Sequence, residues 1–138
     1  MQTYGLPCDW KISMPDNWQG EYAEEDGQCV FYSDNSDLTI RITPFHAERD
    51  GVLAPVEVME NAYINTIPTS AILRSISPYN LDGLCGRMYE STVIEENKTV
   101  YVIYVGYYTL GELLSISIWG TNKTECEQAL DILKTIKR

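Results

Sequence analysis

The sequence predicts an α+β fold in which two main helices pack on a mostly antiparallel sheet of about six strands. Three observations support this prediction. Several segments alternate apolar and polar residues, two segments carry apolar residues three and four positions apart, and the links between strands are mostly short. Residues 1–138 are expected to form one α+β domain, because this length is ordinary for a single hydrophobic core.

The first third of the chain is expected to be strands joined by turns. The segment WKISMP (10–15) predicts a short strand that ends in a turn at PDNW (15–18). The segment GEYAEEDGQCVFYS (20–33) predicts a hairpin with an acidic tip. The segment LTIRITPF (38–45) alternates cleanly, which is typical of a strand with one buried face, and a polar loop, HAERDG (46–51), follows.

A first helix is expected after this loop, because apolar residues then recur at helical spacing, at Val56, Met59, Tyr63 and Ile67. Pro55 is tolerated in the first turn of such a helix, and Pro68 ends it. The segment AILRSIS (71–77) predicts another short strand, and NLDG (80–83) predicts a turn.

The last part of the chain is expected to add three strands and a second helix. The strands are predicted over residues 86–94, 99–108 and 112–119. Asn122 and Glu125 have the spacing of a capping box at the start of the helix. The buried stripe of this helix is expected at Cys126, Ala129, Leu130, Leu133 and Ile136 or Lys137.

The segment VYVIYVGYY (100–108) contains four tyrosines and is apolar on both sides of the predicted strand. If Leu110 and Gly111 form a two-residue turn, one face of the resulting hairpin is aliphatic throughout and belongs to the core. The other face carries Tyr104, Tyr108 and Trp119 around small residues. Two interpretations remain open: a helix packs closely on the small residues, or the three aromatic side chains form a shallow ligand groove.

Composition excludes some classes of partner. The formal net charge is −10, from 20 acidic and 10 basic side chains. Nucleic acids and anionic membrane surfaces would be repelled, whereas a basic protein partner would be attracted. We therefore expect no nucleic-acid or membrane partner and a possible basic protein partner; the pattern gives no oligomeric state.

Location and redox state follow from the N-terminus and the cysteines. The segment MQTYGLPCDW has neither the basic start nor the apolar run of a signal peptide, and no stretch is long enough to span a membrane. The four cysteines, Cys8, Cys29, Cys85 and Cys126, lack metal-site spacing. A cytoplasmic location with free thiols is expected.

Chemical motifs are scarce, so we expect no catalytic residues, no metal site and no cofactor. His46 is the only histidine, and a Cys8, Cys29 or Cys85 nucleophile would depend on it as a base. The carboxylates at 24–26 and 95–96 lie at predicted turns, where charge is easily solvated. The cluster 34–37 lacks the spacing of a calcium loop.

The acidic hairpin is the segment that most suggests a protein-binding surface. Its acidic residues surround one aromatic side chain, and the set consists of Glu21, Tyr22, Glu24, Glu25 and Asp26. Complementary charge steers the association of such a surface with a basic partner. The alternative is a solvated turn that protects a sheet edge from unwanted pairing.

Two segments resemble proteins of the PsbP-like fold. The opening ISMPDNW (12–18) is similar to the strand and Pro-Asp-small-Trp turn of that superfamily, and ALDILKTIK (129–137) is similar to its terminal helix. The superfamily includes the extrinsic PsbP subunit of photosystem II, a eukaryotic Ran-binding import factor and bacterial proteins of unknown function. The resemblance implies a three-layer α/β/α sandwich and a bacterial, non-enzymatic binding role.

Together these features predict a non-catalytic binding module that docks on a protein partner through its acidic surface. Two alternatives are a small-ligand carrier that uses Tyr104, Tyr108 and Trp119, and an immunity or inhibitor protein that neutralises a basic toxin.

Overall fold

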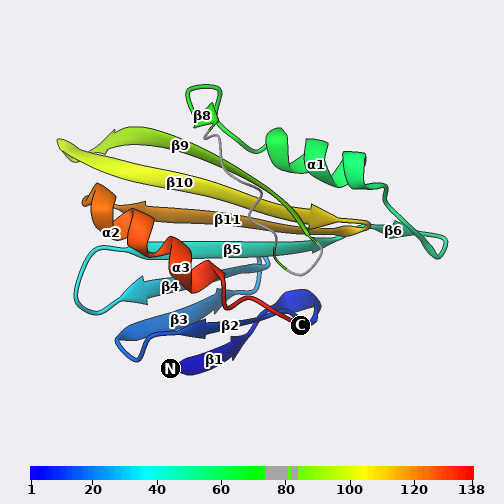
Figure 1. The fold of residues 1–138 in the computed structure, drawn as a ribbon, viewed down its shortest axis with the longest axis horizontal. Coiled ribbons are helices and arrows are strands. Elements are labelled where there is room, and N and C mark those ends of the chain that lie inside the picture. Colours follow the sequence, from blue (N-terminus) through cyan, green and yellow to red (C-terminus); the bar gives the residue numbers. More distant parts are fainter. Residues whose placement is uncertain (74–80, 82–83) are drawn as a thin grey trace.

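The computed structural model describes residues 1–73, residue 81 and residues 84–138. A seven-stranded sheet forms the centre of this described part, and every neighbouring pair of strands is antiparallel (Figure 1). In spatial order its strands are β3 (Trp18–Ala23), β4 (Gln28–Ser33), β5 (Thr39–His46), β11 (Glu112–Gly120), β10 (Lys98–Thr109), β9 (Cys85–Glu95) and β8 (Ile72–Leu73). The α+β class is confirmed, with seven strands in this sheet instead of about six.

Two smaller sheets were not predicted. At the N-terminus, β1 (Gln2–Gly5) pairs with β2 (Lys11–Met14), although QTYG lacks the alternation that identifies a strand. The expected polar loop at 46–51 is instead a hairpin of β6 (Glu48–Arg49) and β7 (Val52–Leu53) that turns through Asp50 and Gly51, both at positive φ. Of the strand predicted at 71–77, Ile72 and Leu73 form β8, while 74–77 lies outside the described residues, as does most of the turn predicted at 80–83.

The register predicted for the tyrosine-rich hairpin is confirmed. Tyr107 pairs with Leu114 and Tyr104 pairs with Ser117, as a two-residue turn at Leu110 and Gly111 requires. Gly111 has a φ of 70°, a left-handed conformation that glycine adopts without a steric penalty. Because side chains alternate along a strand, this register fixes which residues of β10 and β11 lie on each face of the sheet.

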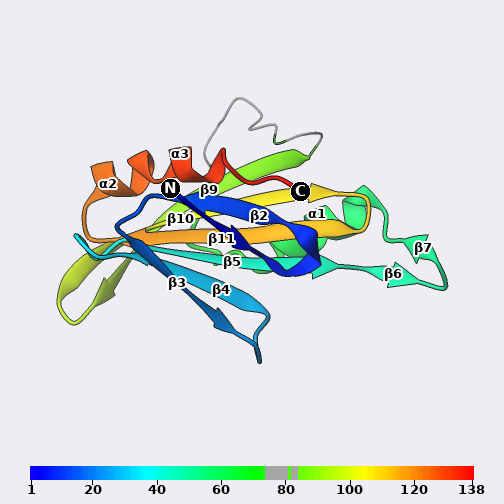
Figure 2. The ribbon, with the colours of Figure 1, turned by 90° about the horizontal axis from the view of Figure 1, so that it is seen from below.

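One face of the sheet carries most of the core. Its central side chains, among them Ile40, Ile116 and Val105, are almost completely buried. Two short helices, α2 (Lys123–Gln128) and α3 (Leu130–Leu133), lie over this face (Figure 2) and contribute the buried side chains of Cys126, Ala129 and Leu133. The β1–β2 hairpin also packs here, where Tyr4 meets Phe31 edge-to-face at 5.2 Å between ring centroids.

The other face receives α1 (Val56–Ile64), which ends three residues earlier than the spacing predicted. Met59 and Tyr63 of α1 form a second core with Tyr108 and Leu113. The close helix contact expected at the small residues occurs at Gly106, where a Cβ atom would lie only 2.6 Å from the Tyr63 ring. Helices cover only part of each face, so strands dominate the fold.

Candidate binding site

The face that carries α1 is covered by this helix at one end only. Cross-strand pairing places Glu21, Val30, Arg41, Ser117 and Tyr104 in one row across five strands on this face. Neighbouring rows add further side chains that are half-buried or exposed, whereas Val102, opposite Trp119, is buried. We call this surface the open face; it consists of Gln19, Glu21, Gln28, Val30, Tyr32, Thr39, Arg41, Thr43, Tyr104, Ser115, Ser117 and Trp119.

Hydrogen bonds between side chains hold parts of the open face in fixed positions. The Tyr32 hydroxyl donates to Glu21 Oε1 at 2.8 Å, and this bond to a carboxylate raises the pKa of Tyr32. Trp119 Nε1 donates to Ser117 Oγ at 2.8 Å, which fixes the orientation of the indole. A surface of ordered polar and aromatic side chains loses less conformational entropy when it binds a partner.

The acidic hairpin stands at the edge of the open face. β3 is an edge strand, and the turn that joins it to β4 is closed by Asp26 N–H donating to the Ala23 carbonyl at 3.2 Å. Figure 2 shows the β3–β4 hairpin extending away from the plane of the central strands. The carboxylates of Glu24, Glu25 and Asp26 are exposed at this tip.

The five predicted partner-binding residues do not share one face. Glu21 belongs to the open face and lies in the same row as Tyr104, which the sequence had assigned to a separate ligand site. Tyr22 is 56% exposed but faces the other side of the hairpin, because its neighbour Glu21 faces the open side. Glu21 therefore lies on the same face of the sheet as Tyr104, one residue of the predicted aromatic groove.

The predicted aromatic groove is divided by α1. Tyr108 is only 4% exposed, and its hydroxyl donates to Glu60 Oε2 of α1 at 2.7 Å. Burial and this bond raise the pKa of Tyr108, and Arg87 Nε completes the cluster at 3.3 Å from the same hydroxyl. Tyr108 is therefore packed beneath the helix, whereas Tyr104 and Trp119 remain on the open face.

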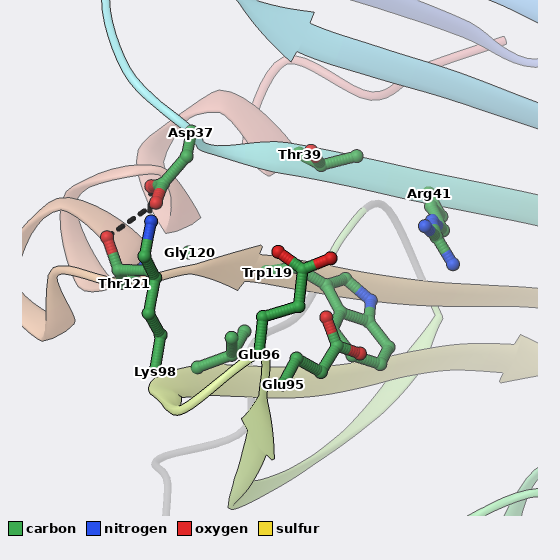
Figure 3. Close-up of a pocket in the computed structure, with 10 residues that line it drawn as sticks. Asp37, Thr39, Arg41, Glu95, Glu96, Lys98, Trp119, Gly120 and Thr121 are labelled. Atoms are coloured by element: carbon green, nitrogen blue, oxygen red, sulfur yellow. Dashed lines mark hydrogen bonds between the residues drawn. The ribbon is translucent and has the colours of Figure 1, made fainter.

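Trp119 lines a hollow of about 680 Å³ at the end of this face that α1 does not reach (Figure 3). Three segments form its walls: the start of β5, the end of β11 and the β9–β10 hairpin. The guanidinium carbon of Arg41 lies 5.2 Å from the centroid of the Trp119 ring, a cation–π contact. The lining residues are Asp37, Thr39, Arg41, Glu95, Glu96, Lys98, Val100, Trp119, Gly120 and Thr121.

Charged side chains around the hollow differ in whether they have a partner. Asp37 accepts a hydrogen bond from the Thr121 hydroxyl, which lowers the pKa of this carboxyl. The positive charge of Lys98 also lowers the pKa of Asp37, whereas Glu95 and Glu96 make no side-chain hydrogen bond or ion pair within the described part of the chain. Figure 3 shows Glu95 and Glu96 extending from the hairpin turn towards the side of the hollow formed by Trp119.

Sequence reasoning identified Trp119 but not the residues around it. For Glu95 and Glu96 the sequence favours a solvated turn over paired catalytic carboxylates, and it indicates no site role for Arg41 or Lys98. Extending the confirmed register from β11 into β5 places Thr39 opposite Trp119, and Arg41 opposite Ser117. The sequence gives no signal that fixes this strand order, because β5 and β11 are separated along the chain by a helix and five further strands among the described residues.

His46 lies outside the open face, among carboxylates. Its Nδ1 lies 2.8 Å from Glu112 Oε1, and its Nε2 lies 3.0 Å from Glu48 Oε2. The hydrogen bonds to Glu48 and Glu112 raise the pKa of His46. Arg138 Nη2 approaches the same Glu112 oxygen at 2.8 Å, so Glu112, the only charged side chain buried among the described residues, has two cationic partners when His46 is protonated.

The thiols show no sign of activation. Within the described residues no cysteine is hydrogen-bonded to His46, and burial raises the pKa of Cys8 and Cys29, which disfavours the reactive thiolate. Burial also raises the pKa of Cys126 to about 11. All four cysteines are free, as expected.

In residues 1–73, 81 and 84–138, no group of three or more His, Cys, Asp or Glu side chains is placed to hold a metal ion. In the same residues no helix is long and apolar enough to cross a membrane.

Solved structures share the fold at low sequence identity. A crystal structure of a protein from Bacteroides thetaiotaomicron aligns with a TM-score of 0.68 and 14% identity over 93% of this chain, which spans only 44% of that protein. The solution structure of cyanobacterial PsbP (CyanoP) from Synechocystis aligns with a TM-score of 0.62 and 14% identity over 99% of this chain and 91% of CyanoP.

This chain has the PsbP-like fold. LpqN of Mycobacterium tuberculosis, described as involved in cell envelope biogenesis, shares it with a TM-score of 0.61 and 12% identity over 99% of this chain and 90% of LpqN. The expectation drawn from ISMPDNW and ALDILKTIK is therefore confirmed for the fold. No family model and no curated protein matches the chain. Identities this low establish a PsbP-like architecture and leave its function to be argued from the site.

Proposed function

We propose that this PsbP-like protein is a non-catalytic bacterial binding module, an α/β/α sandwich that docks on a basic protein partner. The docking surface is the acidic β3–β4 tip together with the adjoining edge of the open face. The observation that carries the proposal is the exposure of Glu24, Glu25 and Asp26 on a hairpin that extends from the sheet, continuous with Glu21 on the open face.

Charge supports this choice of partner. The net charge of −10 creates a negative potential that accelerates encounter with a basic surface and repels nucleic acids. The hairpin tip contains no basic residue between Glu21 and Gly27, so its own side chains do not neutralise the carboxylates. A basic toxin neutralised by this protein would be one member of the proposed partner class.

A matched pair of charge reversals tests the docking surface. Glu24→Lys with Glu25→Lys changes two adjacent carboxylates at the β3–β4 turn, and Glu95→Lys with Glu96→Lys makes the same change at the β9–β10 turn. Capture from a cell lysate, read by mass spectrometry, is expected to recover a basic protein with the unmodified chain and with the second variant but not with the first. Equal recovery by all three proteins would refute the proposed surface.

The hollow beside Trp119 supports a second role, the binding of a small ligand. Its volume of about 680 Å³ is within the range of known ligand sites, and Trp119, one of the three side chains of the predicted groove, lines it. A thermal-shift screen tests this role, since a ligand at 100 times its Kd adds about 2.7 kcal/mol of stability. Shifts that persist in Trp119→Ala would place the ligand elsewhere.

The absence of catalysis is part of the proposal. Both nitrogens of His46 are engaged by carboxylates, which leaves neither one directed at a nucleophile in the described structure. Four free thiols fit a reducing compartment, which supports the proposed cytoplasmic location.

A further inference from the structure

The hollow beside Trp119 contains a cation, Arg41, and two carboxylates, Glu95 and Glu96, that no ion pair joins in the described structure. The guanidinium of Arg41 has the Trp119 ring as its partner, and within the described residues no carboxylate contacts it. Arginine presents several N–H donors in one plane, so a guanidinium that lies over an aromatic ring can still bind a carboxylate through its edge. Arg41 thus offers an anion-binding group whose position is already fixed.

A separate group of carboxylates lies on the opposite wall. Glu95 and Glu96 end β9 and begin the turn to β10, where Glu96 and Asn97 both have positive φ. Within the described residues no hydrogen bond or ion pair neutralises Glu95 or Glu96, and both side chains extend towards the hollow in Figure 3. Asp37 is already bonded to Thr121, so the two glutamates are the carboxylates that a bound cation would meet.

We propose that the hollow binds a small zwitterion, a free amino acid or a short peptide, with its carboxylate on Arg41 and its ammonium group on Glu95 and Glu96. The open edge of the Trp119 indole then contacts the apolar part of the ligand. This inference names the ligand class for the small-ligand role proposed above and rests on that role.

The charges that line the hollow argue against ligands of a single sign. A purely anionic ligand would meet Arg41 but would be repelled by Glu95, Glu96 and a chain of net charge −10. A purely cationic ligand would meet the glutamates but would leave Arg41 without an anionic partner and close to another positive charge. A zwitterion pairs its carboxylate with Arg41 and its ammonium group with Glu95 and Glu96. Each of these charge-assisted hydrogen bonds is stronger than a neutral one.

Isothermal titration with a matched set of probes tests the inference. The probes are L-alanine, L-alanyl-L-alanine, N-acetyl-L-alanyl-L-alanine, which lacks the ammonium group, and L-alanyl-L-alanine amide, which lacks the carboxylate. Each is titrated to about 10 mM, enough to detect a Kd of about 1 mM. At least one zwitterion is expected to bind about tenfold or more tightly than both blocked dipeptides, the ratio that 1.4 kcal/mol provides. The ratio of L-alanine to the dipeptide distinguishes a free amino acid from a peptide as the ligand.

Variants of the hollow test which protein residues bind the carboxylate and the ammonium group of the ligand. Arg41→Gln is expected to make L-alanyl-L-alanine bind no more tightly than its amide. Glu95→Gln with Glu96→Gln is expected to make L-alanyl-L-alanine bind no more tightly than the acetylated dipeptide. Glu24→Gln with Glu25→Gln is the matched control at the other hairpin and should leave all four affinities unchanged.

Each remaining outcome overturns the inference. If no probe binds, or if both preferences survive in the hollow variants, the assignment is wrong. If a blocked dipeptide binds as tightly as the zwitterions and Trp119→Ala abolishes its binding, the small-ligand role stands and only the ligand class falls. Failure of the thermal-shift screen as well would remove the small-ligand role itself.

Discussion

Gly106 shows how a single residue positions the open face. Its missing side chain lets the Tyr63 ring lie directly on β10, which fixes α1 at one end of the sheet and leaves the other end uncovered. A methyl group at this position would overlap the ring carbons at 2.6 Å. The exposure of Trp119 therefore depends on a contact at the far end of the same face.

Gly106→Ala is expected to lower the free energy of unfolding by about 1–3 kcal/mol, the usual effect of overpacking a core. Gly5→Ala is the matched control, because nothing lies within 4 Å of the position that its Cβ would occupy. This control should change stability by no more than about 0.5 kcal/mol. Urea denaturation measures both changes, and equal stability of the two variants would contradict the close packing of α1.

His46 makes a pH-dependent contribution to stability. Its hydrogen bonds to Glu48 and Glu112 raise its pKa in the folded protein. Protonated His46 therefore stabilises the fold fully at pH values below the pKa that His46 has in the unfolded chain. This contribution disappears as pH rises through the higher pKa that His46 has in the folded protein. The melting temperature of the unmodified chain should exceed that of His46→Gln most near about pH 6 and converge with it by about pH 9. A difference that grows with pH would contradict this assignment.

At the scale of elements, α2 depends on its N-terminal cap. The Asn122 side chain accepts a hydrogen bond from Glu125 N–H at 3.0 Å, at the start of a helix of six residues. Asn122→Ala should destabilise the protein by about 1 kcal/mol, and Asn122→Ser should restore most of this loss because serine caps equally well. Chemical denaturation of the three proteins checks the prediction; a serine variant as unstable as the alanine variant would argue against a capping role.

Elements with a strong periodic pattern were predictable, and the irregular ones were not. The alternation in 38–45 predicts the strand β5, and the turn at Leu110 and Gly111 predicts the register between β10 and β11. In contrast, β1 has no alternation of its own and is held by pairing with β2, while the expected last helix is divided into α2 and α3. Tertiary contacts determine the structure of such segments, and a local sequence pattern carries no information about those contacts.

At the scale of the whole molecule, strand order determines which candidate residues meet. The sequence predicts separate sites for Glu21 and Tyr104, yet the pairing of β3, β4, β5, β11 and β10 places them in one row on the open face. It also predicts one groove for Tyr108 and Trp119, although α1 covers Tyr108. These relations arise from pairing between distant segments and from the position of a helix, so residue spacing alone could not reveal them.

The acidic character of the whole chain predicts how binding responds to salt. If charge steers association with a basic partner, raising ionic strength from about 0.01 M to about 0.15 M shortens the screening length from about 30 Å to about 8 Å. The association rate constant should then fall by about tenfold or more, while the dissociation rate constant changes less. Surface plasmon resonance with the captured partner measures both rates; an association rate that is independent of salt would contradict electrostatic steering.

The central claim is that the β3–β4 tip, and not net charge alone, binds the partner. The most direct measurement is the affinity of the purified partner for the unmodified chain, for Glu24→Lys with Glu25→Lys, and for Glu95→Lys with Glu96→Lys at one ionic strength. Our account predicts a loss of about tenfold or more for the first variant, corresponding to at least about 1.4 kcal/mol, and little change for the second. Equal losses in the two variants, or no loss in either, would contradict it.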